Sequence, residues 1–442
     1  MTRAATPERP VRRRAGSSGR SHQAPHSAAE IRLLESSILF AGGRPAEAAA
    51  VAHDVRASLP APDDLAAAVD RAELLGLLGL GDVERLWAPA ERILSGAAPS
   101  DDCEAIGAAL IALGHIAWDD GRVASALGFL GAAVRRTGNG GRHPGDLCHW
   151  YSQVCLARAL IAVEEIESAE RVIADIADGA TRFSSGLWIA AATLLRARLH
   201  LVTGDLEMAD AQARRGLREA QHLATDALTQ LAWFTLAECA LLRGDIDDAT
   251  QWASQARPEP SHGAGFGVAS VDYVEARCAE IDEVPSRAIA LLVDVCDALP
   301  RHKRLLVEEP ASGPWLVGVA LANGDQARAE MLAVALEQVA AENGGLASLA
   351  SRAKRSRALV VGASGSEEDR GCSPVTGWTS LTSQEQRVAV FAAYGLSNRQ
   401  IADRIFLSRH TVDFHLRRVY RKLEMHSRVE LAHFVFERED VA

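Results

Sequence analysis

The residues best suited to chemistry in this 442-residue chain are the cations near its C-terminal end. Between Arg409 and Lys422 the chain has five basic residues and one acid, Asp413, a net charge of +4 in a chain of net charge −11. The wider segment 378–436 holds nine basic residues against five acids, so the acidity lies elsewhere. A cationic stretch that also carries an aromatic residue, Phe414, is typical of a surface that binds DNA. An ordinary solvated helix is the competing interpretation.

Helix start signals divide this segment into four helices. The capping-box pattern, a hydroxyl residue followed three positions later by Glu or Gln, occurs at Thr382, Ser397 and Ser427. Ser408 precedes a further helical stretch. The predicted helices cover approximately residues 383–394, 398–405, 409–423 and 428–437. Because only three residues separate the second helix from the third, the pattern predicts a helix-turn-helix unit whose second helix can enter the major groove.

The spacing of apolar residues assigns the two faces of the 409–423 helix. Apolar residues recur at intervals of three and four and are expected to face the domain core: Val412, Leu416, Val419 and Leu423. The opposite face carries His410, Asp413, Phe414, Arg417 and Arg421. This cationic face is therefore the one that can meet DNA.

A series of short motifs runs through the same segment. L-T-x-x-E stands at Leu381, Thr382 and Glu385, S-N-x-x-I-A at Ser397, Asn398, Ile401 and Ala402, and S-x-x-T-V-x-x-H at Ser408, Thr411, Val412 and His415. K-L and S-R-x-E-L follow at Lys422, Leu423, Ser427, Arg428, Glu430 and Leu431. With this spacing over about 60 residues, the segment resembles the LuxR/NarL-type (GerE) DNA-binding domain. The resemblance implies a transcriptional regulator that binds double-stranded DNA.

The resemblance also implies which side chains meet the DNA. The positions that commonly reach bases in this family are Asp413, Phe414 and Arg417 here. Arg417 would pair with guanine, Phe414 would contact a thymine methyl, and Asp413 would accept a hydrogen bond from cytosine. Many members carry a cation in place of Asp413, and the alternative is that Asp413 only holds Arg417 in an i,i+4 ion pair. The residues assigned to phosphates are Asn398, Arg399, Arg409, Thr411, Arg418, Arg421 and Lys422.

The last predicted helix has apolar residues on more than one side. One face covers the domain, and a spare apolar strip, with Val429, Ala432 and Phe436, suggests pairing with a second copy. The family resemblance likewise implies a homodimer on DNA, which would favour an inverted-repeat site. Core packing alone is the alternative explanation for these residues.

A repeat in residues 28–361 supplies the elements that precede this domain. A six-residue corner recurs at a period of about 40, beginning at Gly43, Gly81, Gly121, Glu164, Gly204, Gly244, Glu283 and Gly324. Gly ends one helix in the left-handed conformation, and the Asp that follows four of these glycines is expected to cap the next helix. Seven corners have Ala five residues later, where a small side chain lets paired helices approach closely. The repeat resembles tetratricopeptide-type helical hairpins stretched beyond their usual ~34 residues, and it predicts an all-α superhelix.

Two further segments complete the predicted domain organisation. Residues 1–27 contain six arginines and few apolar residues, so they are expected to form a disordered basic tail. Residues 362–377 are rich in Gly, Ser and acids, which indicates a flexible linker before a DNA-binding domain at 378–442. The groove of the superhelix is expected to receive an unknown protein or small-molecule effector. Its candidate lining residues are Trp188, Trp233 and Trp252, although each is more often a core residue.

Several classes of function are disfavoured by motifs that the sequence lacks. There is no G-x-x-x-x-G-K-[ST] motif and no G-x-S-x-G motif, so neither an ATPase nor another enzyme is predicted. Seven scattered cysteines without C-x-x-C favour reduced, buried thiols, and neither a metal nor a cofactor is expected. Since no apolar run reaches the length of a membrane helix, we expect a cytoplasmic protein with no membrane partner.

Two hypotheses of function follow from these patterns. The first is a sequence-specific transcriptional regulator that inserts helix 409–423 into the major groove and receives a signal through its repeats. The second is a helical-repeat interaction scaffold whose C-terminal unit mainly mediates pairing. The charge of +4 on the 409–422 segment favours the first.

Overall fold

The computed structural model describes residues 23–58, 65–95, 102–138, 147–257, 268–281 and 286–364 of the repeat region. In the C-terminal region it describes residues 378, 381, 383–393, 396, 398, 400–401, 409–423, 425, 430–431 and 434–435. All regular secondary structure within these ranges is helical, which confirms the predicted all-α class.

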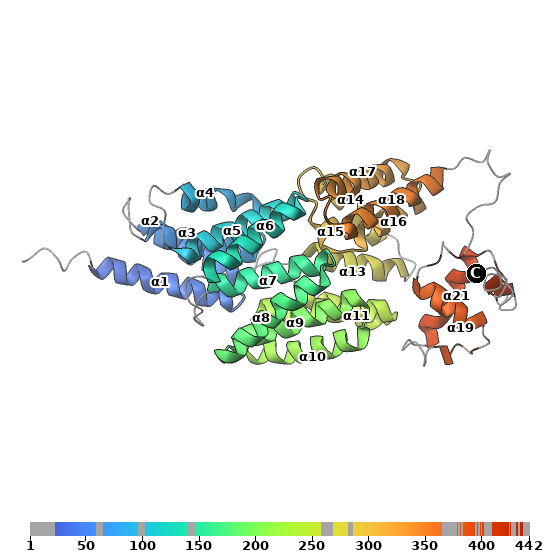
Figure 1. Ribbon diagram of the computed structural model, residues 1–442, viewed down its shortest axis with the longest axis horizontal. Helices are drawn as coiled ribbons and strands as arrows, with labels where there is room; N and C mark the ends of the chain where they lie inside the picture. Colours follow the sequence, from blue (N-terminus) through green and yellow to red (C-terminus); the bar gives the residue numbers. More distant parts are fainter. Residues whose placement is uncertain are drawn as a thin grey trace, which may run out of the picture.

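Helical hairpins follow one another along the chain (Figure 1). The first half contains α1 (Gln23–Ala41), α2 (Pro45–Ser58), α3 (Ala66–Leu80), the 3₁₀ turn η1 (Val83–Arg85), α4 (Trp87–Ser95), α5 (Cys103–Asp119), α6 (Val123–Gly138), α7 (Leu147–Ala162), α8 (Ile166–Arg182), α9 (Gly186–Thr203) and α10 (Leu206–His222). The second half contains α11 (Asp226–Arg243), α12 (Ile246–Ala256), α13 (Val268–Ile281), α14 (Ser286–Ala298), α15 (Arg304–Glu308), α16 (Ser312–Ala322), α17 (Gln326–Glu342), α18 (Ala347–Ser364), α19 (Ser383–Ala393) and α21 (Arg409–Lys422).

The predicted glycine corners join the two helices of their hairpins. All six glycines adopt the left-handed conformation, with φ between 70° and 86°. At Gly204, the glycine N–H bonds back to Leu201, and the next N–H, that of Asp205, bonds to His200 at 2.9 Å. These bonds satisfy carbonyls that the end of α9 would leave without partners. Of the two predicted corners that lack glycine, the one at Glu164 adopts the same conformation, with φ of 64°, and the one at Glu283 lies outside the described residues.

The residues one turn beyond the corners are buried, as the close approach of paired helices requires. Seven alanines at this position are at most 1% exposed, namely Ala48, Ala126, Ala169, Ala209, Ala249, Ala288 and Ala329. Leu86 takes the same place after the Gly81 corner and is also buried. A residue too small to hold the helices apart therefore recurs at seven of the eight predicted corners.

The predicted capping role of the corner aspartates holds at two of four positions. Asp205 accepts a hydrogen bond from the N–H of Met208, and Asp325 accepts one from the N–H of Arg328. The prediction is wrong for Asp82 and Asp245, whose side chains make no capping hydrogen bond. After Asp82 the chain first forms the 3₁₀ turn η1, and the Asp82 carboxylate lies near Arg85 instead. Nothing in the structure explains the difference at Asp245.

The helices extend a few residues past the predicted boundaries of the repeat region. Helix α1 begins at Gln23, inside the stretch 1–27 that was expected to form a tail. Pro25 lies in its first turn, where the missing N–H costs no hydrogen bond. Helix α18 continues to Ser364, three residues into the stretch predicted as a linker. Residues 1–22 and 365–377 lie outside the described residues.

The last hairpins fold back onto the middle of the superhelix. Asn343 donates to the carbonyl of Gly121 at 2.8 Å and accepts from the N–H of Ala124 at 2.8 Å. Lys303 donates its backbone N–H to Asp119 at 2.7 Å. The largest hydrophobic cluster, drawn mainly from α3 to α9, also contains Val307, Val339 and Leu349. The repeat region is therefore a closed turn rather than an open array.

Candidate functional site

Helices α19 and α21 pack around a hydrophobic core of their own (Figure 1). The predicted inner face of α21 is confirmed, since Val412 and Val419 are fully buried and Leu416 and Leu423 are at most 8% exposed. Val388, Ala389 and Ala392 supply the facing side from α19. No described residue of the repeat region belongs to this cluster. The C-terminal segment thus has the separate core that an independent domain needs.

A buried carboxylate ties α19 to α21. Glu385 on α19 is 2% exposed, and the ammonium of Lys422 donates to it at 2.6 Å. The guanidinium Nε of Arg418 lies 3.9 Å from the other carboxylate oxygen. A buried charge requires such compensation, so both cations have a structural role inside the domain. Their side chains are still 31% and 40% exposed, which leaves part of each accessible to a phosphate.

The described residues place only part of the predicted DNA-binding set. Arg417 is exposed on the side of α21 opposite the buried valines, and Asn398 is half-buried in a helical position. The other predicted residues on α21 are helical, but nothing is described of their side chains: Arg409, Thr411, Asp413, Phe414 and Arg421. Outside the described residues lie Arg399 and the three predicted pairing residues Val429, Ala432 and Phe436.

The remaining motif residues are consistent with this arrangement. Helix α19 begins at Ser383, one residue after Thr382, as the capping-box pattern predicts, although Thr382 itself lies outside the described residues. Residues 398, 400 and 401 are helical shortly before α21 begins at Arg409. His415 lies on α21 and is half-buried; burial lowers the pKa of its imidazole against the raising effect of Glu385, with Arg418 and Lys422 lowering it further. A neutral His415 therefore belongs to the packing of the domain rather than to its cationic face.

Helices α19 and α21, packed around a core of their own, are the regular elements that the structure describes in this segment. Residues 379–435 match the family of bacterial regulatory proteins described as the luxR family. The C-terminal domain is therefore a luxR-family helix-turn-helix domain, which confirms the resemblance found in the motifs.

Curated relatives match over this domain. A Mycobacterium tuberculosis protein named as an HTH-type transcriptional regulator is 50% identical over 58 residues, which are 13% of this chain and 7% of that protein. The nitrate/nitrite response regulator homologue of Haemophilus influenzae is 48% identical over 58 residues, 13% of this chain and 28% of that protein. The Fimbriae Z protein of Escherichia coli is 43% identical over 53 residues, 12% and 25% of the two chains. The chain thus spans only a small part of the length of these relatives.

Solved structures resemble the repeat region in fold. The Rap protein complexed with competence and sporulation factor has a TM-score of 0.49 at 13% identity, over 76% of this chain and 97% of that one. NprR in complex with its cognate peptide NprX has a TM-score of 0.47 at 14% identity, over 75% of this chain and 98% of that one. At these values the likeness concerns the helical architecture alone.

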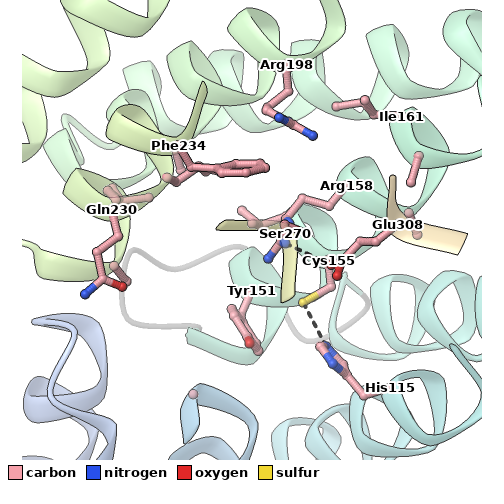
Figure 2. Close-up of a pocket in the computed structure, with 18 of the residues that line it drawn as sticks. His115, Tyr151, Cys155, Arg158, Ile161, Arg198, Gln230, Phe234, Ser270 and Glu308 are labelled. Atoms are coloured by element: carbon pink, nitrogen blue, oxygen red, sulfur yellow. Dashed lines mark hydrogen bonds and ion pairs between the residues drawn. The ribbon is translucent and has the colours of Figure 1, made fainter. Parts of the chain in front are cut away.

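The repeats enclose a cavity of about 220 Å³ (Figure 2). Its walls are the first helices of successive hairpins, α5, α7, α9 and α11, together with parts of α1, α13 and α15. Of the three candidate tryptophans, Trp188 lines it. Trp233 and Trp252 instead pack against a hydrophobic cluster of α11 to α13.

The sequence patterns did not predict the charged residues of the cavity. Arg158 on α7, Arg198 on α9 and Glu308 on α15 each stand in an ordinary helical stretch, and no motif joins them. The structure brings Arg158 and Glu308 to 3.1 Å although they are 150 residues apart in sequence. The only sequence signal for this charged site would have been an arginine at a similar position along two successive inner helices.

A cysteine and a histidine also meet in the cavity wall. The thiol of Cys155 lies 3.6 Å from Nε2 of His115. Burial raises the pKa of Cys155 to about 12 and lowers that of His115 to about 3, with Arg304 and Arg158 lowering the latter further. The pair is therefore a neutral thiol beside a neutral imidazole, and it lacks the thiolate that a cysteine nucleophile needs.

Among the described residues, no group of three or more potential ligands is placed to hold a metal ion. Within the same ranges, none of the helices combines the length and apolar character needed to cross a membrane.

Proposed function

We propose that this protein is a sequence-specific DNA-binding transcriptional regulator that acts in the bacterial cytoplasm, where its DNA target lies. The observation that carries the proposal is helix α21, whose valines are buried against α19 while Arg417 is exposed on the other side. The match to the luxR family over residues 379–435 supports the same function. Because the match covers one domain, the activity of the whole chain is inferred from that domain.

In the proposed complex, α21 lies in the major groove. Asp413, Phe414 and Arg417 read base edges, with Arg417 paired to guanine. The residues proposed to hold phosphates are Asn398, Arg399, Arg409, Thr411, Arg418, Arg421 and Lys422. Lys422 and Arg418 then have two tasks, since they also compensate the buried carboxylate of Glu385.

The proposed regulator binds DNA as a homodimer. Val429, Ala432 and Phe436 form the proposed contact between copies, and a two-fold dimer would select an inverted-repeat site. The repeat region receives the signal, either a protein or a small molecule, because it occupies most of the chain and encloses a cavity. None of these proposed tasks requires catalysis.

The test is a titration of the full chain with duplex DNA at increasing salt. A DNA-binding regulator that contacts phosphates through several cations will lose affinity steeply as salt rises. A scaffold whose C-terminal unit only pairs copies of the chain will show no such binding. Sites for the titration come from sequencing the genomic fragments that the intact protein retains.

Arg417 supplies the specific prediction. Arg417→Ala should lose about 1–3 kcal/mol of binding free energy at its matched base pair and relax the preference there. Arg387→Ala is the matched control, because Arg387 is an exposed arginine of α19 with no proposed contact. Equal affinity and equal base preference for Arg417→Ala and the unaltered protein would remove Arg417 from base reading.

A further inference from the structure

The cavity is a bounded chamber because both ends of the repeat region close on its middle. The corner at Gly43 lies against the start of α11, where a Cβ on this glycine would stand 2.8 Å from the nitrogen of Ala227. Phe40 meets Tyr151 of α7 edge to face, with ring centroids 5.1 Å apart. The last hairpins contact the α5–α6 corner, as described above, and Ser348 of α18 donates to the carbonyl of Val163 at the end of α7 at 2.6 Å. These contacts bound the cavity at its ends, and its volume of about 220 Å³ suits a small molecule.

The chamber is apolar toward one end of its inner helices and charged toward the other. Helices α7, α9 and α11 are the first helices of successive hairpins, so they run parallel. On α9, Leu187 and Trp188 line the cavity near the start of the helix, and Arg198 lines it near the end. At 1.5 Å per residue, roughly 16 Å separate Leu187 from Arg198 along the axis.

Helices α7 and α11 follow the same order. Leu147 and Val154 precede Arg158 on α7, and Leu228 and Leu231 line the early half of α11. An occupant that lies along these helices therefore meets only uncharged groups at first and the two arginines further along, where Ile161 and Val202 also line the cavity.

The charged end holds guanidinium groups from two neighbouring helices, both aimed into the cavity (Figure 2). Arg158 donates to Glu308 at 3.1 Å, and Arg304 donates to the other oxygen of the same carboxylate at 2.9 Å. Arg198 lies over the ring of Phe234 at 4.9 Å and only 3.9 Å from the carboxylate of Glu309. That last separation is too long for a hydrogen bond.

The charges at this end of the cavity are balanced, so an anionic ligand must share the arginines with the glutamates that already contact them. Three arginines and two glutamates line the cavity, and Glu238, which is not among the lining residues, also contacts Arg198. Burial raises the pKa of Glu309 despite Arg198 nearby, and burial lowers the pKa of Arg198. Each member of this pair is therefore shifted toward its neutral form, because neither fully compensates the other in this buried place. A ligand carboxylate would share Arg198 with Glu238 and Glu309, as it would share Arg158 with Glu308.

We propose that the chamber binds a small amphipathic carboxylate, with its carboxylate between Arg158 and Arg198 and its apolar chain along the early halves of α7, α9 and α11. This ligand is the signal of the proposed regulator, so the inference rests on the proposed function. A ligand of this class fits a cavity with apolar walls and a few convergent polar groups.

The same end of the chamber is connected to the helix that leads toward the DNA-binding domain. Arg352 on α18 is 1% exposed and donates to the carbonyl of Val307 at 3.0 Å. It also donates to the carbonyl of Ala162 and pairs with Glu164 at 3.2 Å. Val307 directly precedes Glu308. A carboxylate that competes with Glu308 for Arg158 therefore acts one residue from the anchor of α18.

The test uses octanoate as the probe and the full chain as the receptor. Binding is measured by calorimetry and by the fluorescence of Trp118 and Trp188, which line the cavity. Octan-1-ol and octylamine carry the same hydrocarbon chain with a neutral and a cationic head. We expect octanoate to bind at least ten times more tightly than either. No binding of octanoate, or equal binding of the three, would overturn the proposal.

Two variants locate the site. Arg158→Gln should weaken octanoate about tenfold to a hundredfold, the value of a charge-assisted hydrogen bond. Arg171→Gln, an exposed arginine of α8 outside the cavity, is the matched control and should bind as the unaltered protein does. Val154→Trp fills the apolar part without removing a charge and should abolish binding. If Arg158→Gln does not fold, Val154→Trp alone tests the site. Unchanged octanoate affinity in Val154→Trp would contradict the proposed site.

The two proposals fail separately. Calorimetry with octanoate contains no DNA, so a negative result there leaves the salt-dependent binding of duplex DNA intact. A protein that binds octanoate through Arg158 but no DNA would overturn the proposed function and keep the chamber as a carboxylate site.

Discussion

Charged side chains in the interior of this protein depend on partners that are distant in sequence. Glu308 shows the balance of forces. Burial alone would raise the pKa of its carboxyl, but Arg304 and Arg158 lower it to about 2. The same two guanidinium groups, acting with burial, lower the pKa of His115 to about 3. Residues from α5, α7 and α15 therefore set one another's protonation states.

His115 makes the stability of the repeat region sensitive to moderate acid. The folded protein holds this imidazole neutral down to about pH 3, whereas the unfolded chain protonates it near 6.5. The free energy of unfolding should therefore fall as the pH drops below 6.5, by up to about 1.4 kcal/mol per pH unit. His115→Gln removes this contribution. Chemical denaturation between about pH 6 and pH 5 should show a shallower pH dependence for the variant.

The ionised Glu308 contributes to the free energy of unfolding in a lower pH range. Its stabilisation is complete above its ordinary pKa of 4.5 and is lost as the pH falls toward about 2. The two effects can therefore be distinguished by pH. Equal slopes for His115→Gln and the unaltered protein above pH 5 would contradict the assignment to His115.

At the scale of elements, the corner glycines differ from glycines inside helices. Gly204 has φ of 86°, and a Cβ placed there would meet no atom within 4 Å. Gly204→Ala should therefore lower the free energy of unfolding by about 1 kcal/mol through backbone strain alone. Gly128 lies within α6, where an added Cβ also meets nothing within 4 Å.

Gly128→Ala is the matched control and should raise the free energy of unfolding by about 0.5–1 kcal/mol. Thermal or denaturant melts measure both variants. A loss of stability in Gly128→Ala, or no loss in Gly204→Ala, would show that backbone conformational preference does not determine the effect of alanine at these two positions.

The corners also show how far the sequence predicts the elements. Glycine with Ala five residues later is a recognisable pattern because left-handed backbone strongly favours glycine. Ser184 and Ala224 adopt the same conformation, with φ of 54° and 50°, at the turns that lead into α9 and α11. These corners could not be predicted, because neither residue type favours that conformation. Tertiary contacts that hold the flanking helices have overridden the local preference.

Part of the candidate site could likewise be predicted from the sequence, and part could not. The inner face of α21 could be predicted because Val412, Leu416 and Val419 repeat at helical spacing and the capping patterns mark the helix starts. The pairing of Lys422 with Glu385 could not, because it joins residues 37 positions apart that carry no shared pattern. The chamber could not be predicted from the sequence either, because Arg158 and Arg198 lie on separate helices. Only the fold shows that both residues face it.

At the scale of the whole molecule, the side chain of Asn343 makes the polar contacts that most directly join the last hairpins to the first half of the repeat region. Its side chain is 2% exposed and bonds to Gly121, Ala124 and Val339. Asn343→Ala should lower the free energy of unfolding by about 1–3 kcal/mol, because the buried carbonyl of Gly121 loses its donor and the N–H amide of Ala124 loses its acceptor. Hydrogen exchange of that amide should become faster.

Asn323→Ala provides the control for this contact. Asn323 is an exposed asparagine at the end of α16, and its removal should change stability by less than about 0.5 kcal/mol. Slow exchange at Ala124 in the Asn343→Ala variant would show that other contacts hold the closure without this side chain.

Closure of the superhelix also limits how such a chain can change in length. In an open array each hairpin touches only its neighbours, so hairpins can be gained or lost singly during evolution. Here contacts such as Lys303 with Asp119 and Asn343 with Gly121 join positions that stand one full circuit apart. Insertion or loss of one 40-residue hairpin between them would displace every one of these contacts together. The number of hairpins is thus set by geometry, and lineages that carry this architecture should vary in loop length while their hairpin count stays constant.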